Sequence, residues 1–181
     1  MSTEHLDTNL LIRELCRAML DEVATSDSNI RPLQVTGLGR HFAIPAEDAH
    51  RLTRSNGADV TSYVARIDEE WESPWLADTD RTWESLHRCL MTGPTPLRYA
   101  ILGGRPLTDG SPYLTRLIPP DQVPLTADAL ADVEEGWLRG TFSALGLHGD
   151  FPWAREGLTE VRDLFTLAAK TRRAVLFTAN T

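Results

Sequence analysis

His87 is the side chain in this sequence best suited to acid–base chemistry, because an imidazole partly withdrawn from water has a tunable pKa and can act as a general base. Trp83 precedes it by one helical turn, and the pair Gly103-Gly104 follows, where the backbone can approach a ligand with no side chain in the way. His41, on a predicted strand, could line the same pocket. These five residues form the candidate pocket that the sequence predicts.

A structural role competes with that interpretation, and we favour it: His87 could fill a core position and hydrogen-bond a carbonyl, as buried polar groups usually do. Ser85 points to another face of the helix and Cys89 lies two residues from His87, so neither is an evident nucleophile. His148 and Asp150 lie in a predicted loop, which alone is weak evidence for a catalytic pair. A metal site needs three or four ligands, so the sequence predicts no catalytic set, no metal site and no cofactor.

A second candidate site is an acidic segment that contains two tryptophans. Glu69, Glu70 and Glu72 crowd the end of a predicted helix, next to Trp71 and Trp75. Carboxylates with aromatic anchors are a recurrent interface composition, so this segment could bind a basic protein partner. The alternative, which we favour modestly, is a solvated loop that leads into the next helix. No histidine accompanies the carboxylates to complete a metal site.

The run from Thr79 to Leu107, which contains Trp83, His87 and the glycine pair, has the strongest structural signals in the chain. Its first part predicts an amphipathic helix whose apolar stripe has the spacing i, i+3, i+4, i+7 and i+8: Trp83, Leu86, His87, Leu90 and Met91. Asp80 can cap the start of this helix, and Gly93 with the prolines after it ends the helix. Leu97 to Leu102 then predicts a strand buried on both faces, followed by the glycine pair as a turn.

The same run carries a resemblance to a known family. The pattern DxxWxxLHxxLxTG, from Asp80 to Gly93, and the ILGG of Ile101 to Gly104 are similar to the signature of the YfbM-like family, a bacterial domain of unknown function. The segment GLGRHFAIPAEDAHRL, which begins at Gly37, and the tail from the helix at Leu158 to the strand AVLF extend the resemblance over about residues 32–181. The resemblance implies a fold and brings no activity with it.

Two features depart from that family. Residues 1–30 form an N-terminal extension with an amphipathic helix, whose apolar residues recur at helical spacing: Ile12, Leu15, Cys16, Met19, Leu20 and Val23. We expect this helix to pack on its own domain rather than to bind a partner. Pro124 lies where the family has a helix after a strand, and this proline puts that helix in doubt.

The remaining elements predict one α/β domain (α+β) over residues 31–181. Strands are expected at 33–44, 113–118 and 174–178. In the first of them, Phe42 and Ile44 alternate with His41 and Ala43, and the Gly-x-Gly of Gly37 and Gly39 marks a bulge or a crossing point.

Helices are expected at 45–54, about 60–67, 126–130, 132–142 and about 158–168. The second of them has an apolar stripe, formed by Val60, Tyr63, Val64 and Ile67. Thr126 is expected to cap the third, Asp132 with Glu135 the fourth, and residues 146–153 are expected to form a loop. Because strands and helices interleave without a strict βαβ repeat, the sequence predicts a mixed sheet with helices packed on more than one side.

Charge and composition exclude several classes of function. Acidic residues exceed basic ones by 26 − 18 = 8, and Lys170 is the only lysine, so the surface should repel nucleic acid and anionic lipid. A basic protein partner remains compatible with this charge. The two cysteines, Cys16 and Cys89, have apolar neighbours and are expected to be reduced. With no apolar run long enough for a membrane span and no signal peptide, the sequence predicts a cytoplasmic protein.

Two hypotheses of function follow. The first, which we prefer, is a non-enzymatic protein-binding domain, such as an inhibitor, an adaptor or an immunity-type factor, that uses the acidic tryptophan-bearing surface. The second is a small hydrolase or a domain that binds a small molecule in the pocket around His87. The oligomeric state does not follow from the sequence.

Overall fold

The computed structural model describes residues 37–110, 112–147 and 149–180, so the predicted N-terminal helix, Cys16 and His148 lie outside the described residues. Five strands form one sheet in the order β2-β1-β5-β4-β3: β1 (Gly39–Ile44), β2 (Leu76–Asp80), β3 (Arg105–Gly110), β4 (Tyr113–Ile118) and β5 (Ala174–Asn180). All neighbouring pairs are antiparallel, where a mixed sheet was expected. The central strand, β5, is the last in the sequence, so the sheet is completed only at the C-terminal end of the domain.

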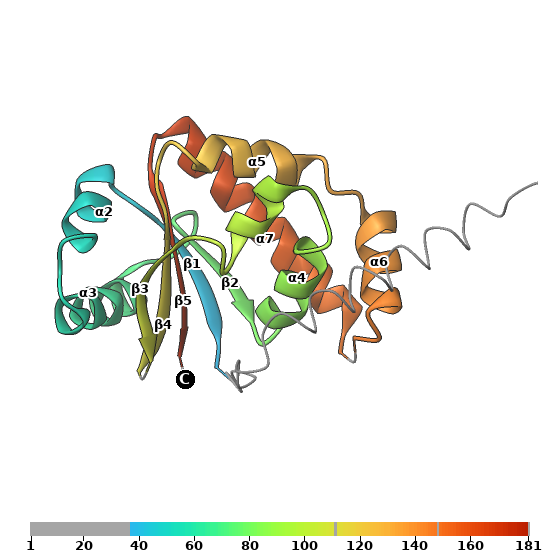
Figure 1. Cartoon of the computed structure of the whole chain (residues 1–181), viewed down its shortest axis with the longest axis horizontal. Coiled ribbons are helices and arrows are strands. Elements are labelled where there is room, and N and C mark those ends of the chain that lie inside the picture. Colours follow the sequence, from blue (N-terminus) through green and yellow to red (C-terminus); the bar gives the residue numbers. More distant parts are fainter. Residues whose placement is uncertain (1–36, 111, 148, 181) are drawn as a thin grey trace, which may run out of the picture. The chain divides into compact units, whose positions relative to one another are not determined.

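Helices cover both faces of the sheet, which confirms the predicted α+β class (Figure 1). One face carries α2 (Ala46–Leu52) and α3 (Gly57–Glu70). The other carries α4 (Trp83–Leu90), the 3-10 helix η1 (Thr95–Ala100), α5 (Val123–Ala131), α6 (Glu135–Ala144) and α7 (Phe151–Lys170). Among the described helices, none has a stretch that is both long and apolar enough to span a bilayer.

Each face of the sheet has its own hydrophobic core, because successive side chains on a strand point to opposite sides. Phe42 and Ile44 pack with α2 and α3, whereas Ala43 belongs to the core on the α7 side. The predicted alternation in β1 is therefore confirmed. The apolar stripe predicted for α3 is confirmed as well, since all four of its residues are buried: Val60, Tyr63, Val64 and Ile67.

The strand predicted at Leu97–Leu102 is wrong. The segment forms η1, in which Leu97 and Ala100 are buried one 3-10 turn apart. Proline in the first turn of η1 favours this start, because its fixed φ suits a helix and its missing N–H is not needed there. The strand of this region comes later, as β3 at the edge of the sheet.

Helix α4 differs from its predicted stripe at two positions. Trp83, Leu86 and Leu90 are buried as expected, but Cys89 is buried with them, and Met91, just beyond the helix, is 40% exposed. Asp80 does not cap the helix, because it ends β2. Thr82 occupies the cap position, but its hydroxyl donates to the carbonyl of Thr79 at 2.6 Å and accepts no capping bond from the helix.

Helices α5 and α6 also begin differently from the prediction. Pro124 lies in the first turn of α5, where a proline is well tolerated, so the helix that it put in doubt is present. Thr126 does not cap this helix, since its hydroxyl donates back to the carbonyl of Gln122 inside it. Asp132 follows the C-terminal end of α5, and α6 begins after Glu134 without a side-chain cap.

Candidate functional site

His41 ties β1 to η1. Its Nε2 atom donates a hydrogen bond to the carbonyl of Ala100 at 3.0 Å, because a carbonyl can only accept. The ring is fully buried and packs on Phe177, with centroids 4.8 Å apart. Burial lowers the pKa of His41 to about 4, while the bond to Ala100 opposes part of that shift. Its Nδ1 atom has no partner among the described residues.

Trp83 packs on the same side of the sheet as His41. Its ring lies 5.5 Å from that of Phe177, between centroids, and its indole Nε1 donates to the carbonyl of Gly37 at 3.0 Å. A Cβ on Gly39 would approach the indole ring to 2.5 Å. The glycine at position 39 therefore makes room for the tryptophan, and the register of β1 against β2 shifts beside it, as the predicted bulge requires.

His87 lies one turn after Trp83 and is half-buried. Burial lowers the pKa of its imidazole to about 4, and Nδ1 is buried without a hydrogen-bond partner in the part of the chain that the structure describes. The imidazole is therefore neutral near pH 7.

Gly103 and Gly104 pack closely against backbone atoms of other segments of the chain. A Cβ on Gly103 would lie 2.2 Å from the carbonyl oxygen of Arg98, and one on Gly104 would lie 2.8 Å from that of Leu117. Of the predicted pocket, Trp83 and His41 meet at Phe177. None of its five residues lines any of the three cavities described for the chain.

The acidic segment at the end of α3 has exposed carboxylates and partly covered tryptophans. Glu69, Glu70 and Glu72 are exposed, and Glu70 pairs with Arg66 at 3.0 Å. Trp71 packs edge-on against Phe42 in the core under α2 and α3. The guanidinium carbon of Arg173 lies over Trp75, 4.1 Å from the centroid of the indole ring. The tryptophans thus attach the segment to the domain, and the carboxylates face solvent.

A further group of carboxylates lines a groove of about 700 Å³ between α7 and the end of β2, which we call the acidic groove. Its acidic residues are Asp78, Asp80, Glu156 and Glu160. Arg81 also lines it, so four carboxylates face one guanidinium. Its apolar side chains include Leu38 and Trp153, which are 38% and 58% exposed.

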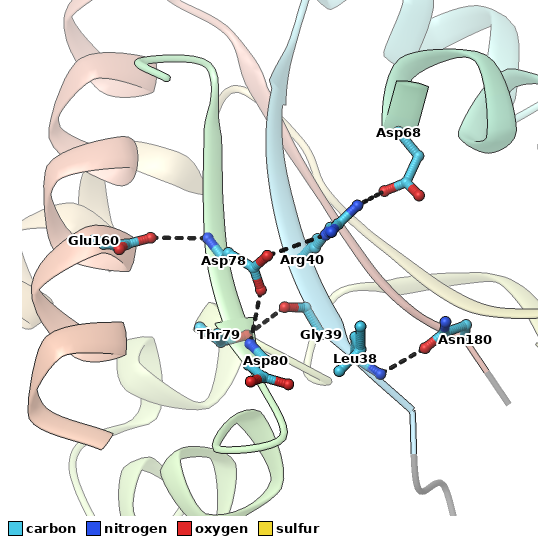
Figure 2. A network of polar contacts seen from close by, with 9 residues as sticks. All are labelled: Leu38, Gly39, Arg40, Asp68, Asp78, Thr79, Asp80, Glu160 and Asn180. Carbon is cyan, nitrogen blue, oxygen red and sulfur yellow. Dashed lines mark hydrogen bonds and ion pairs between the residues drawn. The ribbon is translucent and has the colours of Figure 1, made fainter. Parts of the chain in front are cut away.

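The wall of the groove is the edge strand β2, which pairs with β1 on one side only. Figure 2 shows how its outer edge is covered: Glu160 of α7 accepts a hydrogen bond from the backbone N–H of Asp78 at 2.9 Å. On the inner side, the hydroxyl of Thr79 donates to the carbonyl of Gly39 at 2.8 Å. These bonds fix the end of the strand where it meets α7.

Arg40 neutralises one carboxylate of the groove. It contacts Asp68 at 2.7 Å and Asp78 at 3.2 Å (Figure 2). The hydrogen bond to Asp68, followed by the attraction of both carboxylates, raises the pKa of Arg40. Asp80, Glu156 and Glu160 have no ion-pair partner within the described ranges.

Asp80 has an unusual backbone conformation, with φ of 43°, in the left-handed region that aspartate tolerates better than most residues. Its N–H donates to Oδ1 of Asp78 at 2.8 Å, which stabilises the turn into α4. Its own Oδ1 is buried and accepts no hydrogen bond from any described residue. Asp80, which lines the groove, therefore has one oxygen that the protein encloses without a described donor.

The sequence interpretation did not identify this groove. Asp78 and Asp80 alternate along β2, and Trp153, Glu156 and Glu160 recur at i, i+3 and i+7. The sequence predicts a loop over residues 146–153, whereas α7 begins at Phe151, so the prediction does not place Trp153 on a helix. Recognising the helix start would have placed the three side chains on one face.

Comparisons with known proteins match the domain described above. The model of the family described as domain of unknown function (DUF1877) matches residues 36–178. Among solved structures, the chain is similar to the protein of unknown function YfbM from Escherichia coli, with a TM-score of 0.59 and 18% sequence identity, over 78% of this chain and 99% of that one. No curated protein matches the chain. At this identity the structural match shows a common fold alone.

Proposed function

Because the chain belongs to the DUF1877 family, whose description gives a domain and no activity, we propose a function from its own surface: it is a non-enzymatic domain that binds a protein partner through a basic segment. An inhibitor, an adaptor or an immunity-type factor would act in this way. The observation that carries the proposal is the acidic groove, where three carboxylates that form no ion pair with any described residue lie beside an exposed tryptophan.

The charge of the whole chain supports the same proposal. With a net charge of −8, the surface attracts basic proteins over a distance and repels acidic ones. Glu69, Glu70 and Glu72 add a second exposed acidic surface at the end of α3. Trp71 and Trp75 are partly covered by Phe42 and Arg173, so this second surface attracts by charge, whereas Trp153 in the groove can act as an aromatic anchor.

The alternative is a pocket for a small molecule, or a hydrolytic site, around His87. It draws support from the buried Nδ1 atom, because a buried acceptor without a donor is uncommon and a general base has this property. The described hydrogen bonds link His87 to no serine, cysteine or carboxylate, so we place this function second. A substrate-library screen with the wild type and His87→Ala tests it: an activity that the variant retains excludes the role of His87.

The test of the protein-binding proposal is a direct binding measurement with the full chain. Immobilised protein is exposed to peptides rich in arginine and lysine, and to peptides of the same length in which glutamate replaces these residues. We expect the basic peptides alone to bind, and binding to weaken as salt shortens the screening length from about 10 Å at 0.1 M to about 3 Å at 1 M. Equal binding of the acidic peptides, or no binding of any basic peptide, contradicts the proposal.

Two sets of variants locate the surface. Glu69→Gln, Glu70→Gln and Glu72→Gln together remove the charge at the end of α3. Glu156→Gln with Glu160→Gln removes charge from the groove. We expect the groove variant to weaken binding more, because the groove also offers an apolar contact.

A further inference from the structure

A cavity of about 510 Å³, distinct from the acidic groove, lies between α6, α7 and the residues that link α5 to α6. We propose that it binds a small carboxylic acid that carries an apolar group, a function beyond the one proposed above. The carboxylate binds two arginines of α7, and the apolar group contacts three aliphatic side chains. The residues that line the cavity are Val133, Glu135, Leu138, Arg155, Glu156, Leu158, Thr159 and Arg162.

Arg162 is held in one orientation by the backbone beside the cavity. Its Nε donates to the carbonyl of Leu130 at 2.9 Å, and its Nη2 donates to that of Val133 at 2.7 Å. These bonds leave Nη1 and one N–H of Nη2 without a described acceptor, because a guanidinium has more donors than two bonds use. A carbonyl carries no net charge, so Arg162 is a partly buried cation with no ion-pair partner among the described residues. Its fork of donors suits a carboxylate.

Arg155 and Thr159 add polar groups on the same side of the helix. With Arg162 they are spaced i, i+4 and i+7 on α7, so the three residues lie on one face. Arg155 is 55% exposed, and its described ion pair is a long one, 3.5 Å to Glu135. Glu135 has a shorter bond, of 2.7 Å, to Arg139. Arg155 can therefore turn to a ligand while Glu135 keeps Arg139 as its partner.

The charge at this cavity is opposite to that of the chain. Arg155 and Arg162 line it and Arg139 holds its rim, facing Glu135 and Glu156, a balance of 3 − 2 = +1. The chain as a whole carries −8. A ligand with one negative charge matches this balance, whereas a phosphate dianion is less suitable beside two glutamates.

The aliphatic side chains determine the other half of the ligand. Val133, Leu138 and Leu158 are buried, and together they form an apolar wall of the cavity. Sites for small molecules usually combine such a wall with a few placed polar groups, in a volume of about 300–1,000 Å³. A carboxylate attached to an apolar group uses both features, whereas a fully polar anion would use the arginines alone.

The experiment compares three probes of similar size that differ in charge: phenylbutyrate, its neutral amide phenylbutanamide, and the cation phenylbutylamine. Each is titrated into the isotopically labelled full chain, and backbone amide NMR signals report both affinity and location. We expect phenylbutyrate to shift the signals of Val133, Leu138 and Thr159, and the amide to bind about tenfold more weakly. Because the net charge of −8 attracts the amine, a preference for the acid cannot come from the overall charge.

Two variants connect that preference to α7. Arg155→Gln removes a mostly exposed charge and should leave the fold intact. Arg162→Lys keeps the charge but cannot hold both carbonyls and still present a fork to a carboxylate. Each should weaken phenylbutyrate binding about tenfold and reduce its advantage over the amide. The control is Arg88→Gln, which removes an exposed arginine of α4 outside the cavity.

Thermal unfolding of each variant verifies the fold, and if Arg162→Lys is destabilised, Arg155→Gln decides. The inference is overturned if phenylbutyrate shows no saturable binding, if the amide binds equally well, or if Arg155→Gln binds the acid as the wild type does. Shifts that cluster away from the cavity overturn it too. A short peptide ending in phenylalanine tests the other source of a carboxylate: tighter binding than phenylbutyrate at the same signals would assign the cavity to a peptide terminus instead of a small acid.

Discussion

At the residue scale, His41 is buried and His87 is half-buried, and burial lowers the pKa of each imidazole to about 4. His41 has a clear structural task, because its Nε2 holds the carbonyl of Ala100. His87 has no described bond through Nδ1. Both histidines are therefore neutral near pH 7, but the imidazole of His41 has a described hydrogen bond and that of His87 has none.

The shifted pKa of His41 predicts acid sensitivity. The unfolded chain binds this proton with a pKa of 6.5 and the folded chain with one of about 4, so between these values the unfolded state holds more protons. Stability is therefore complete above about pH 6.5 and falls as the pH drops toward 4, by about 1.4 kcal/mol per pH unit for this histidine. Urea unfolding at pH 7 and pH 5 measures the loss.

A matched pair of variants tests whether His41 causes the loss of stability between pH 7 and pH 5. His41→Gln retains a donor for Ala100 and removes the titration, so the difference in stability between the two pH values should shrink. His50→Gln, at an exposed position, should leave the difference unchanged. An undiminished pH dependence in His41→Gln would show that other groups cause it.

Gly39 provides a second test at this scale. The Cβ of Gly39→Ala would approach the ring of Trp83 to 2.5 Å, so we expect a loss of about 1–3 kcal/mol from overpacking. The control is Gly136→Ala in α6, where no atom lies within 4 Å of the added Cβ and helix propensity favours alanine by about 1 kcal/mol. The urea concentration at the midpoint of unfolding should therefore fall for Gly39→Ala and rise for Gly136→Ala.

At the scale of elements, the edge strand β2 and the long helix α7 depend on each other. A free strand edge invites pairing with other chains, and proteins often cover such edges. Here Glu160 covers the edge by accepting the N–H of Asp78. The same contact brings the carboxylates of both elements together in the acidic groove.

Removing that cover should weaken the edge. Glu160→Ala leaves the N–H of Asp78 without its described partner, and we expect a loss of about 0.5–1.5 kcal/mol together with a greater tendency to aggregate. Glu156→Ala, one turn earlier on α7, is the control, since it has no described hydrogen bond to lose. Urea unfolding and light scattering on heating measure the two effects, and equal behaviour of both variants would refute the role of Glu160.

At the scale of the whole domain, β5 joins the two cores. Leu176 packs with α2 and α3, whereas Phe177 packs on the α7 side. The central position of β5 in the sheet means that neither core can be completed without it. The two cores should consequently fold as one cooperative unit.

The prediction is a single unfolding transition for both faces. Leu176→Ala and Phe177→Ala should each lower stability by about 2–5 kcal/mol, through cavities on opposite sides of the sheet. Tryptophan fluorescence and far-UV circular dichroism should report the same midpoint in each variant. Two separate midpoints would show that the faces unfold independently.

By itself, the sequence determined the parts that depend on near neighbours. The stripe of α3, the alternation of β1 and the bulge at Gly39 follow from the spacing of apolar residues and glycines, and helices on both faces follow from the interleaved elements. Prediction failed at Leu97–Leu102, because an apolar run this short is compatible with a strand or a helix, and packing selected η1.

Only the tertiary structure decided the candidate site. The acidic groove joins Leu38, the turn after β2 and the first turns of α7, which are far apart in sequence. Local periodicity in the sequence cannot predict that α7 lies along the edge of β2, because that placement follows from packing of the whole core. The unpaired oxygen of Asp80 is likewise a property of its surroundings, since hydrogen-bond partners distant in sequence cannot be inferred from spacing.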